Sequence, residues 1–413
     1  VMVGNFVGSN ALAAVGASSS MIYLLIAFSQ GAAVGAGVIV AQYLGARDKK
    51  SVSDAVHTSL VIAGILGIVL TIAGIVLSRQ LLEWMKTPDE VMEQAVTYFR
   101  LYSAGMFFGI VYNMAAGILN AAGNSKRSLL YLAVASFTNI ILDILFIAIL
   151  DMGVAGAAIA TDISQAVSCI LSMAFLMRVK DSYQVSLKKL KIHRRIAGSM
   201  IRVGLPTGIQ NMVISLSNVL VQTSVNGFGA AAMAGYTAYL KVDGFNILPV
   251  MSFSMAVTTF AGQNYGAGNY DRVKKGMYVT LVMGFVYTVL TGALLLTFDD
   301  QIMGMFSRDA EVITCGKLAM KYFCPFYFIL SILHGLSGAL RGVGKSIPPM
   351  VVLLLSLCVF RIFWIWLVLP HFSTIEGVYL LYPVSWALGA VMIIIYACTA
   401  KWLPGGRQQG KVR

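Results

Sequence analysis

The sequence has few charged residues: Asp, Glu, Lys and Arg make up only 11% of its 413 residues, whereas 58% are hydrophobic. A soluble domain usually carries about 25% charged residues. So few charges cannot cover a water-soluble surface of this size, which excludes a cytosolic enzyme, a disordered chain and a nucleic-acid-binding protein. The composition therefore predicts a protein that lies in a lipid bilayer.

Cysteine and histidine are also scarce, and neither occurs in a metal-binding motif. The five cysteines stand singly without a CxxC pair, and the four histidines show no HExxH spacing. These patterns give no disulfide framework and no metal site of these common kinds. The sequence also lacks a GxxxxGK[ST] motif, so no ATP-binding site is expected.

Long uncharged runs occupy most of the chain. About 20 helical residues cross the hydrocarbon core of a bilayer. Backbone groups in lipid must be hydrogen-bonded within their own segment, so each run is expected to be a helix. We predict an all-α polytopic membrane protein with eleven helices, at roughly 12–44, 55–78, 97–122, 128–150, 152–177, 203–226, 231–265, 276–298, 318–340, 347–369 and 377–400.

The basic residues are distributed unevenly between the loops. Of the 30 Lys and Arg residues, 22 lie in one alternating set of loops and six in the other. The positive-inside rule places the richer set in the cytoplasm and predicts a cytoplasmic C-terminus. The net charge of +13 is therefore interpreted as a topology signal and not as a nucleic-acid-binding patch.

An internal repeat divides the chain. The loop QYLGARDKKSV at 42–52 aligns with QNYGAGNYDRV at 263–273, and Gly156 aligns with Gly377, all with an offset of 221 residues. One constant offset across separate elements predicts a duplicated six-helix unit, with the second copy beginning near Ser199. An even number of helices gives both copies the same orientation, with a pseudo-two-fold axis along the membrane normal.

The same offset predicts the lobes of the molecule. The first copy would begin about 22 residues before Val1, so we expect helix 1 to be missing from this chain. The predicted parts are an N-lobe at 1–178 with helices 2–6, a cytoplasmic linker at 179–197, and a C-lobe at 198–413 with helices 7–12 and a short cytoplasmic tail.

Three motifs carry a resemblance to a known family: VGNFVGSNALAAVG at 3–16, GLPTGIQN at 204–211, and the paired QxxGA loops that follow helices 2 and 8. In their order, and with the repeat, they resemble the multidrug and toxic compound extrusion (MATE) family of bacterial efflux transporters. The resemblance covers the whole chain and implies a V-shaped pair of lobes. It implies a secondary antiporter of the bacterial cytoplasmic membrane that exports cationic or amphipathic drugs. The only cofactor implied is a coupling ion, Na⁺ or H⁺.

Asp143 is the first candidate for the ion site, because a charge inside a membrane is costly and is usually functional. Asn139 lies one turn earlier on the same helix face. Both side chains offer oxygen ligands to a hard cation, and the Asp143 carboxylate can instead bind a proton. By the resemblance, Thr161 on the next helix completes an N-lobe site for Na⁺ or H⁺, together with an Asp expected before Val1. The alternative is that Asn139 and Asp143 only join helices through hydrogen bonds.

Further polar residues are candidates for cavity lining or gating: Asp162, Gln210, Lys241, Asp243 and Arg361. Asp162 would attract cations or pair with a base on the facing lobe, and Arg361 would bind backbone carbonyls or Asp243. The acids that some family members place in helices 7 and 10 are absent, so coupling is assigned to the N-lobe. Four prolines are expected to kink helices, either for bending between states or as static bends: Pro206, Pro249, Pro325 and Pro383.

Three other functions fit less well. A flippase of lipid-linked oligosaccharide from the same superfamily would need a strongly basic cavity, whereas Lys241 and Arg361 are the only interior bases. An intramembrane enzyme would need a clustered acid/base or metal set, and the sequence suggests none. A channel would be excluded by flux that depends steeply on substrate saturation.

Overall fold

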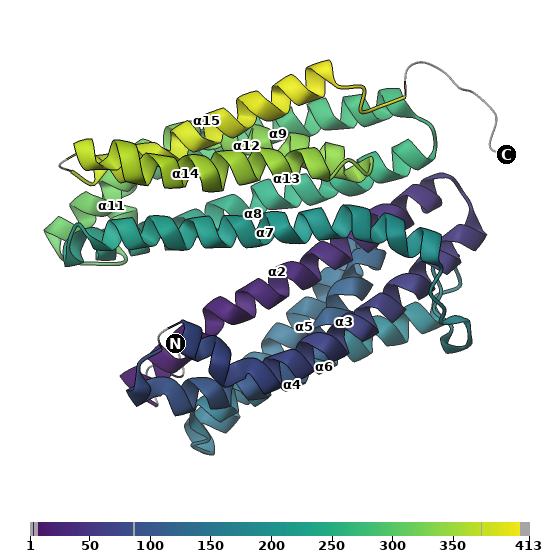
Figure 1. The fold of residues 1–413 in the computed structure, drawn as a ribbon, viewed down its shortest axis with the longest axis horizontal. Helices are drawn as coiled ribbons and strands as arrows, with labels where there is room; N and C mark the ends of the chain where they lie inside the picture. The colour runs from purple at the N-terminus through teal and green to yellow at the C-terminus, as the bar shows by residue number, and fades with distance from the viewer. Residues whose placement is uncertain (1–2, 4–6, 86, 373, 405–413) are drawn as a thin grey trace. The chain divides into compact units, whose positions relative to one another are not determined.

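The computed structural model describes residues 3, 7–85, 87–372 and 374–404. These residues form helices joined by short connections, and none of them lies in a β-strand (Figure 1). The chain separates into two units, Val1–Gly208 and Ile209–Arg413, and the boundary falls inside helix α7 (Arg194–Asn226). The all-helical fold predicted from the uncharged runs is confirmed.

The first unit is built around one central helix. Its elements are α2 (Ser9–Gly45), α3 (Lys49–Trp84), α4 (Asp89–Ala121), α5 (Ser125–Asp143), η1 (Ile144–Ile149), α6 (Gly153–Arg178), η2 (Leu187–Lys189) and the first part of α7. Helix α4 packs against α2, α3 and α6, and its Phe99, Ile118 and Leu119 are fully buried. Helix α3 instead leaves many large apolar side chains exposed, such as Ile68 and Val76, which suits contact with lipid.

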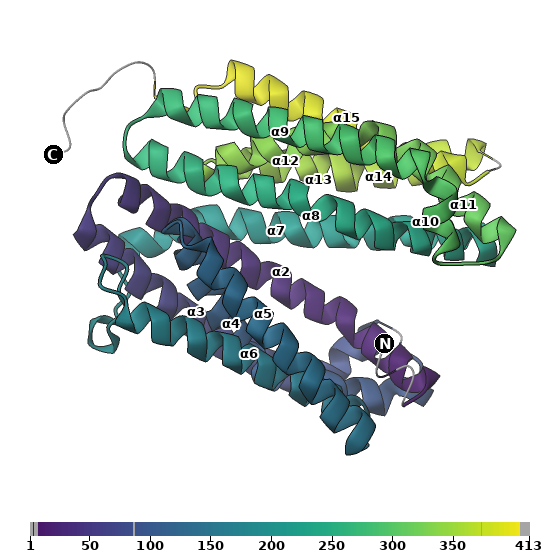
Figure 2. The same cartoon turned by 180° about the vertical axis from the view of Figure 1, so that it is seen from behind.

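The second unit surrounds α12 in the same manner. Its elements are the rest of α7, α8 (Ala230–Gly266), α9 (Tyr270–Thr297), α10 (Asp299–Gly304), α11 (Ala310–Phe323), η3 (Cys324–Phe326), α12 (Tyr327–Gly342), α13 (Ile347–Leu354), η4 (Leu355–Val359), α14 (Phe360–Phe363), η5 (Trp364–Val368), η6 (Leu369–His371) and α15 (Glu376–Thr399). Helix α12 packs against α8, α9 and α15 (Figure 2). Its core is unusually aromatic, with Tyr236, Tyr239, Phe323, Tyr327 and Tyr379 at most 2% exposed.

Local sequence explains where several helices begin. The Asp48 carboxylate caps α3, because it accepts hydrogen bonds from the Ser51 N–H at 3.0 Å and from the Ser51 hydroxyl at 2.6 Å. These bonds favour the ionised carboxylate and lower the pKa of Asp48. Asp309 caps α11 in the same way by accepting from the Glu311 N–H at 2.9 Å. Both caps stand at ends of uncharged runs.

Ten helices in the described part of the chain are long and apolar enough to cross a membrane. They coincide with ten of the predicted runs, and the remaining run at 203–226 lies in the less apolar α7. The predicted count of eleven helices is wrong, since the described residues form fourteen α-helices, α2 to α15. One reason is that 3-10 or π-helical turns divide two runs, since 318–340 falls in α11 and α12 and 347–369 contains α13 and α14. The predicted helix before Val1 is not confirmed.

The four prolines occupy two kinds of position. Pro206, Pro249 and Pro383 lie inside the α-helices α7, α8 and α15. Pro325 lies in η3, the 3-10 turn that separates α11 from α12. Proline lacks the N–H that continues an α-helix, which is consistent with an interruption at this point.

Candidate ion and substrate site

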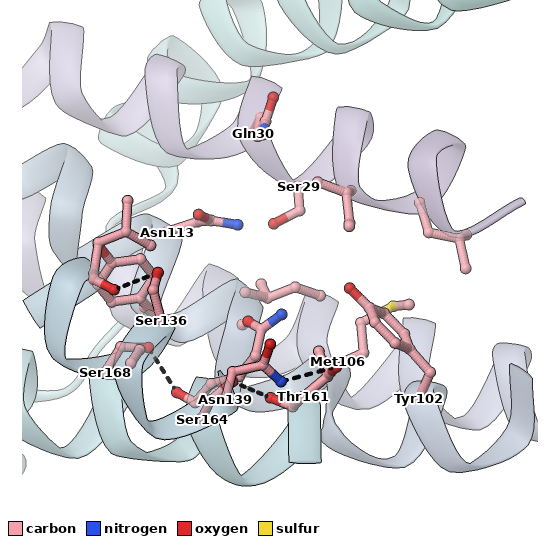
Figure 3. A pocket seen from close by; sticks show the side chains of 18 of the residues that line it. Ser29, Gln30, Tyr102, Met106, Asn113, Ser136, Asn139, Thr161, Ser164 and Ser168 are labelled. Atoms are coloured by element: carbon pink, nitrogen blue, oxygen red, sulfur yellow. Dashed lines mark hydrogen bonds between the residues drawn. The ribbon is translucent and has the colours of Figure 1, made fainter. Parts of the chain in front are cut away.

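A cavity of about 380 Å³ lies inside the first unit (Figure 3). Four helices line it, namely α2, α4, α5 and α6, and the described lining residues include no charged side chain. Hydroxyl and amide groups predominate among its polar groups: Ser29, Gln30, Tyr102, Tyr112, Asn113, Ser136, Asn139, Thr161, Ser164, Gln165 and Ser168. The cavity therefore combines uncharged polar groups with apolar side chains.

The α6 wall of the cavity follows from helical periodicity. Thr161, Ser164, Gln165 and Ser168 are spaced i, i+3, i+4 and i+7, which places them on one face of the helix. The three hydroxyls each donate to a carbonyl of their own helix, at 2.9 Å for Thr161, 2.7 Å for Ser164 and 2.9 Å for Ser168. Since a hydroxyl has one hydrogen, what these groups offer to a ligand is mainly lone pairs.

The structure brings two predicted site residues together at this cavity. The Asn139 side-chain amide of α5 donates to the Thr161 hydroxyl of α6 at 3.5 Å, and both residues line the cavity. Figure 3 shows this bond crossing between the two helices. The contact joins residues 22 positions apart, as the predicted site requires.

Asp143 lies one turn beyond Asn139 but is not among the residues that line the cavity. It is the last residue of α5, and the backbone continues from it into the π-helix η1. Its Oδ1 atom is buried without a hydrogen-bond partner. The phenol of Tyr98 in α4 interacts electrostatically with Asp143 and with Asp162. Leaving a buried carboxylate oxygen without a partner is energetically costly.

Asp162 also lies outside the described cavity lining. Its side chain is pressed against α4 at Gly105, where a Cβ atom would come within 2.1 Å of the Asp162 Cγ. Asp162 is one residue after Thr161, and a 100° turn of the helix explains why it faces α4 instead of the cavity. The prediction that Asp162 lines the cavity is therefore not supported by this geometry.

The other predicted cavity or gating residues belong to the second unit. Gln210 is buried, at 3% exposure, whereas Lys241 is exposed. Arg361 is 2% exposed, and its guanidinium donates to the Ser217 hydroxyl at 3.0 Å and to the Ser385 hydroxyl at 3.1 Å. It also lies 4.4 Å from the centre of the Tyr382 ring. The predicted pairing with backbone carbonyls or Asp243 is thus wrong, because hydroxyls and an aromatic face take those positions.

Asp243 is half-buried and is bound by phenols. It accepts hydrogen bonds from the Tyr327 hydroxyl at 2.6 Å and from the Tyr239 hydroxyl at 3.3 Å. Sequence reasoning identified Asp243 but not these partners. The Tyr239 partner lies at i,i+4 on the same helix and was visible in the sequence, whereas Tyr327 is 84 residues away.

Most of the cavity lining was also missed by sequence reasoning. The spacing of Thr161, Ser164, Gln165 and Ser168 was the available signal, because four polar residues on one face of an apolar helix indicate a polar contact surface. Ser29 and Asn113 lie on different helices, α2 and α4, so only the tertiary structure places them at the same cavity.

Comparison with known families shows to which family the chain belongs. The model of the MatE family matches residues 1–145 and 206–367, which is more than half of the chain. The chain belongs to the MatE family. The resemblance inferred from the motifs is confirmed, and the molecule is a multi-pass MATE multidrug efflux transporter and not an enzyme. Drug-like small molecules are the substrates of MATE transporters.

Two bacterial relatives illustrate the similarity. The probable multidrug resistance protein YoeA of Bacillus subtilis is 27% identical over 410 residues, which cover 95% of this chain and 87% of the relative. The probable multidrug resistance protein YpnP of the same organism is 28% identical over 359 residues, covering 87% of this chain and 80% of the relative.

Solved structures have the same fold. An outward-facing multidrug resistance MATE family transporter of the MOP superfamily aligns with a TM-score of 0.90 at 24% identity, over 96% of this chain and 89% of its own. A MOP superfamily transporter from Pyrococcus furiosus, described as having a binding pocket of reverse polarity, aligns with a TM-score of 0.89 at 25% identity, over 96% and 90%. The similarity supports the MATE fold for this chain.

Proposed function

We propose that this MATE transporter is a secondary active antiporter that exports cationic or amphipathic drugs across the cytoplasmic membrane. Inward flow of Na⁺ or H⁺ drives the export, and the coupling ion binds at Asn139, Asp143 and Thr161. The C-terminus lies in the cytoplasm, and 179–197 links an N-lobe at 1–178 to a C-lobe at 198–413. Bending at the prolines inside α7, α8 and α15 accompanies the change between states.

One observation carries the ion site: the buried, unpartnered Oδ1 atom of Asp143 stands one turn from the Asn139–Thr161 hydrogen bond. A proton on Asp143 would remove the charge of this buried group, and Na⁺ would be coordinated by the oxygen. The Asn139 carbonyl and the Thr161 hydroxyl are further oxygen ligands of the kind that hard cations prefer. The three residues therefore fit either coupling ion.

The polarity of the cavity supports a substrate that carries hydrogen-bond donors. The hydroxyls of Thr161, Ser164 and Ser168 donate within α6, so the lone pairs of these groups are what remains for a ligand. Ser136 does the same on α5, where its hydroxyl donates to the Leu132 carbonyl at 2.9 Å. An ammonium group or an amine-bearing drug matches such acceptors, and the apolar lining residues suit its hydrophobic part.

Coupling requires only that ion and drug favour opposite states. If the ion binds more tightly to one conformation and the drug to the other, binding of the ion promotes release of the drug. The Asp143 carboxyl group is the charge that changes in this exchange, since the cavity lining itself carries none.

The test is replacement of Asp143 by Asn in a bacterium that lacks its own efflux pumps. We expect D143N to lower the initial rate of cationic dye efflux by about tenfold or more, because an amide neither takes up a proton at neutral pH nor neutralises a cation. The matched control is D151N, since Asp151 is exposed and its positive φ of 51° is well tolerated by Asn. Wild-type efflux by D143N would exclude this ion site.

Thr161 gives a second test in proteoliposomes with an imposed Na⁺ or H⁺ gradient. We expect T161V to weaken the response to the gradient and T161S to preserve it, because only Ser keeps the hydroxyl that accepts from Asn139. Efflux that ignores both gradients would exclude the antiporter. Binding of a lipid-linked pyrophosphate in place of the dye would favour a flippase.

A further inference from the structure

Asp243 is an acid of the second unit to which the proposed function assigns no role. Its Oδ1 atom accepts from the hydroxyls of Tyr327, at 2.6 Å, and Tyr239, at 3.3 Å. The two phenol oxygens are also hydrogen-bonded to each other. Both tyrosines are only 2% exposed. Three oxygen atoms from α8 and α12 therefore form a triangle in which every pair is within hydrogen-bonding distance.

The number of protons in this triangle depends on the charge of Asp243. Three contacts need three hydrogens, but an ionised Asp243 leaves only the two phenolic hydrogens of Tyr239 and Tyr327. One of the three contacts then has no hydrogen. A proton on Asp243 supplies the missing one, so that Asp243 donates to Tyr239, Tyr239 to Tyr327, and Tyr327 back to Asp243. The ring is then closed, and each of its bonds polarises the next.

We propose that Asp243, Tyr239 and Tyr327 form a proton-binding site in the second unit, which takes up one proton per chain. The site is separate from Asn139, Asp143 and Thr161, and it does not depend on the drug or on the coupling ion. Proton uptake closes a hydrogen-bonded ring whose members come from α8 and α12, so it changes how firmly these two helices are joined.

The charged groups around the site leave it free to titrate. The hydrogen bonds of Arg361 go to Ser217 and Ser385, and no ion pair with Asp243 occurs among the described residues. A direct ion pair would hold the carboxylate ionised. Lys241 is two residues from Asp243 on α8 and is exposed, so it points to another side of the helix.

Each neighbouring element contributes further titratable groups. From α15, Tyr382 interacts electrostatically with Asp243 and Arg361, and its hydroxyl is 2.5 Å from that of Tyr236 on α8. From η3, Cys324 interacts with Asp243. On α9, Tyr287 donates to the Asn246 carbonyl, and on α11, Lys317 pairs with Asp299 and Asp300. Tyr236 and Tyr382 thus each interact electrostatically with both Arg361 and Asp243.

The test is pH-difference infrared spectroscopy on the purified chain in lipid nanodiscs. Spectra are recorded between about pH 4 and about pH 10, the range in which carboxylic acids and phenols of proteins ordinarily titrate. We expect a protonated carboxyl band that is lost in D243N and retained in D271N, where the replaced acid is exposed on α9. Tyrosine ring bands should change together with the carboxyl band. Identical carboxyl spectra for the wild type and D243N would overturn the proposal.

Y327F provides a test that keeps the carboxyl group. The ring of Tyr327 stacks on Trp386, with centroids 6.1 Å apart, and this packing survives the substitution. Loss of the hydroxyl opens the ring, so the Asp243 band should shift in frequency and in its midpoint pH. A band that stays unchanged would show that the phenol does not belong to the site. D143N separates this proposal from the antiporter, since the Asp243 band should persist in D143N whether or not D143N transports the dye.

Discussion

The Nε2 atom of His57 in α3 accepts a hydrogen bond of 3.0 Å from the backbone N–H of Ser186, 129 residues later in the chain. The Nδ1 atom of the same ring lies 2.6 Å from the Ser53 carbonyl, to which it donates, and this pair of bonds fixes the neutral tautomer. Thr58 adds two bonds, because its hydroxyl donates to the Lys191 carbonyl at 3.3 Å and accepts from the His193 N–H at 3.2 Å. One turn of α3 therefore holds the segment that precedes α7.

Replacement of His57 by Leu tests this attachment. His57 is 1% exposed, and Leu leaves the Ser186 N–H without its acceptor. A buried donor without a partner costs about 1–3 kcal/mol, so we expect hydrogen exchange of the Ser186 amide to accelerate by roughly tenfold or more. Mass spectrometry of peptides that cover 179–193 measures this.

The control for His57 is the exposed His371, for which H371L should leave exchange in 179–193 unchanged. If H57L also left this exchange unchanged, the segment would be held by Thr58 and by packing and not by the imidazole.

A second prediction concerns the close contact between α8 and α12. A Cβ atom at Gly342 would lie 2.4 Å from the Thr258 carbonyl oxygen, and one at Gly338 would lie 2.5 Å from the Ser254 carbonyl oxygen. Such spacing of small residues lets two membrane helices approach closely. Polar bonds reinforce the contact, because the Thr258 hydroxyl donates to the Gly338 carbonyl at 2.9 Å.

Gly342→Ala should therefore destabilise the second unit, since a backbone atom cannot move aside as a flexible side chain can. We expect a loss of about 1–3 kcal/mol, the usual cost of overpacking, and a lower midpoint of thermal unfolding in detergent. Gly64→Ala is the matched control, because a Cβ at Gly64 in α3 meets nothing within 4 Å. Alanine is the better helix former there by about 1 kcal/mol. Equal midpoints for the two variants would contradict the contact.

The sequence predicted the helices well because membrane insertion depends on a local property. An uncharged run of sufficient length, as in α3 or α9, has few alternatives to a helix in lipid. The interruptions were not predicted, since the π-helical turn at 144–149 lies in a run as apolar as its neighbours. Helix α7 contains Asn and Gln between its apolar residues, and for that reason it is a weaker span than the others.

The candidate site was predictable only in part. Asn139 and Asp143 could be paired by their helical spacing, and the family resemblance added Thr161. The cavity also needs Ser29 and Asn113, each from a different helix, and nothing in the sequence brings them together. The same holds for Arg361, whose partners Ser217 and Ser385 come from positions 144 residues before it and 24 after it. Contacts between distant helices depend on packing, which local pattern does not encode.

The last prediction concerns this buried arginine. Arg361 uses two directions of its planar guanidinium for Ser217 and Ser385 and its face for the Tyr382 ring. Lysine keeps the charge but cannot reproduce this fork or stack in the same way. We therefore expect R361K to lower the free energy of unfolding by roughly 1–3 kcal/mol, because hydroxyl groups in the core lose their donors. Thermal unfolding followed by tryptophan fluorescence measures the change, since Trp386 packs against Tyr382.

The control K241R exchanges the same two residue types at an exposed position and should change stability by less than about 0.5 kcal/mol. A wild-type unfolding midpoint for R361K would mean that the charge alone, and not the geometry of the fork, is what the second unit requires.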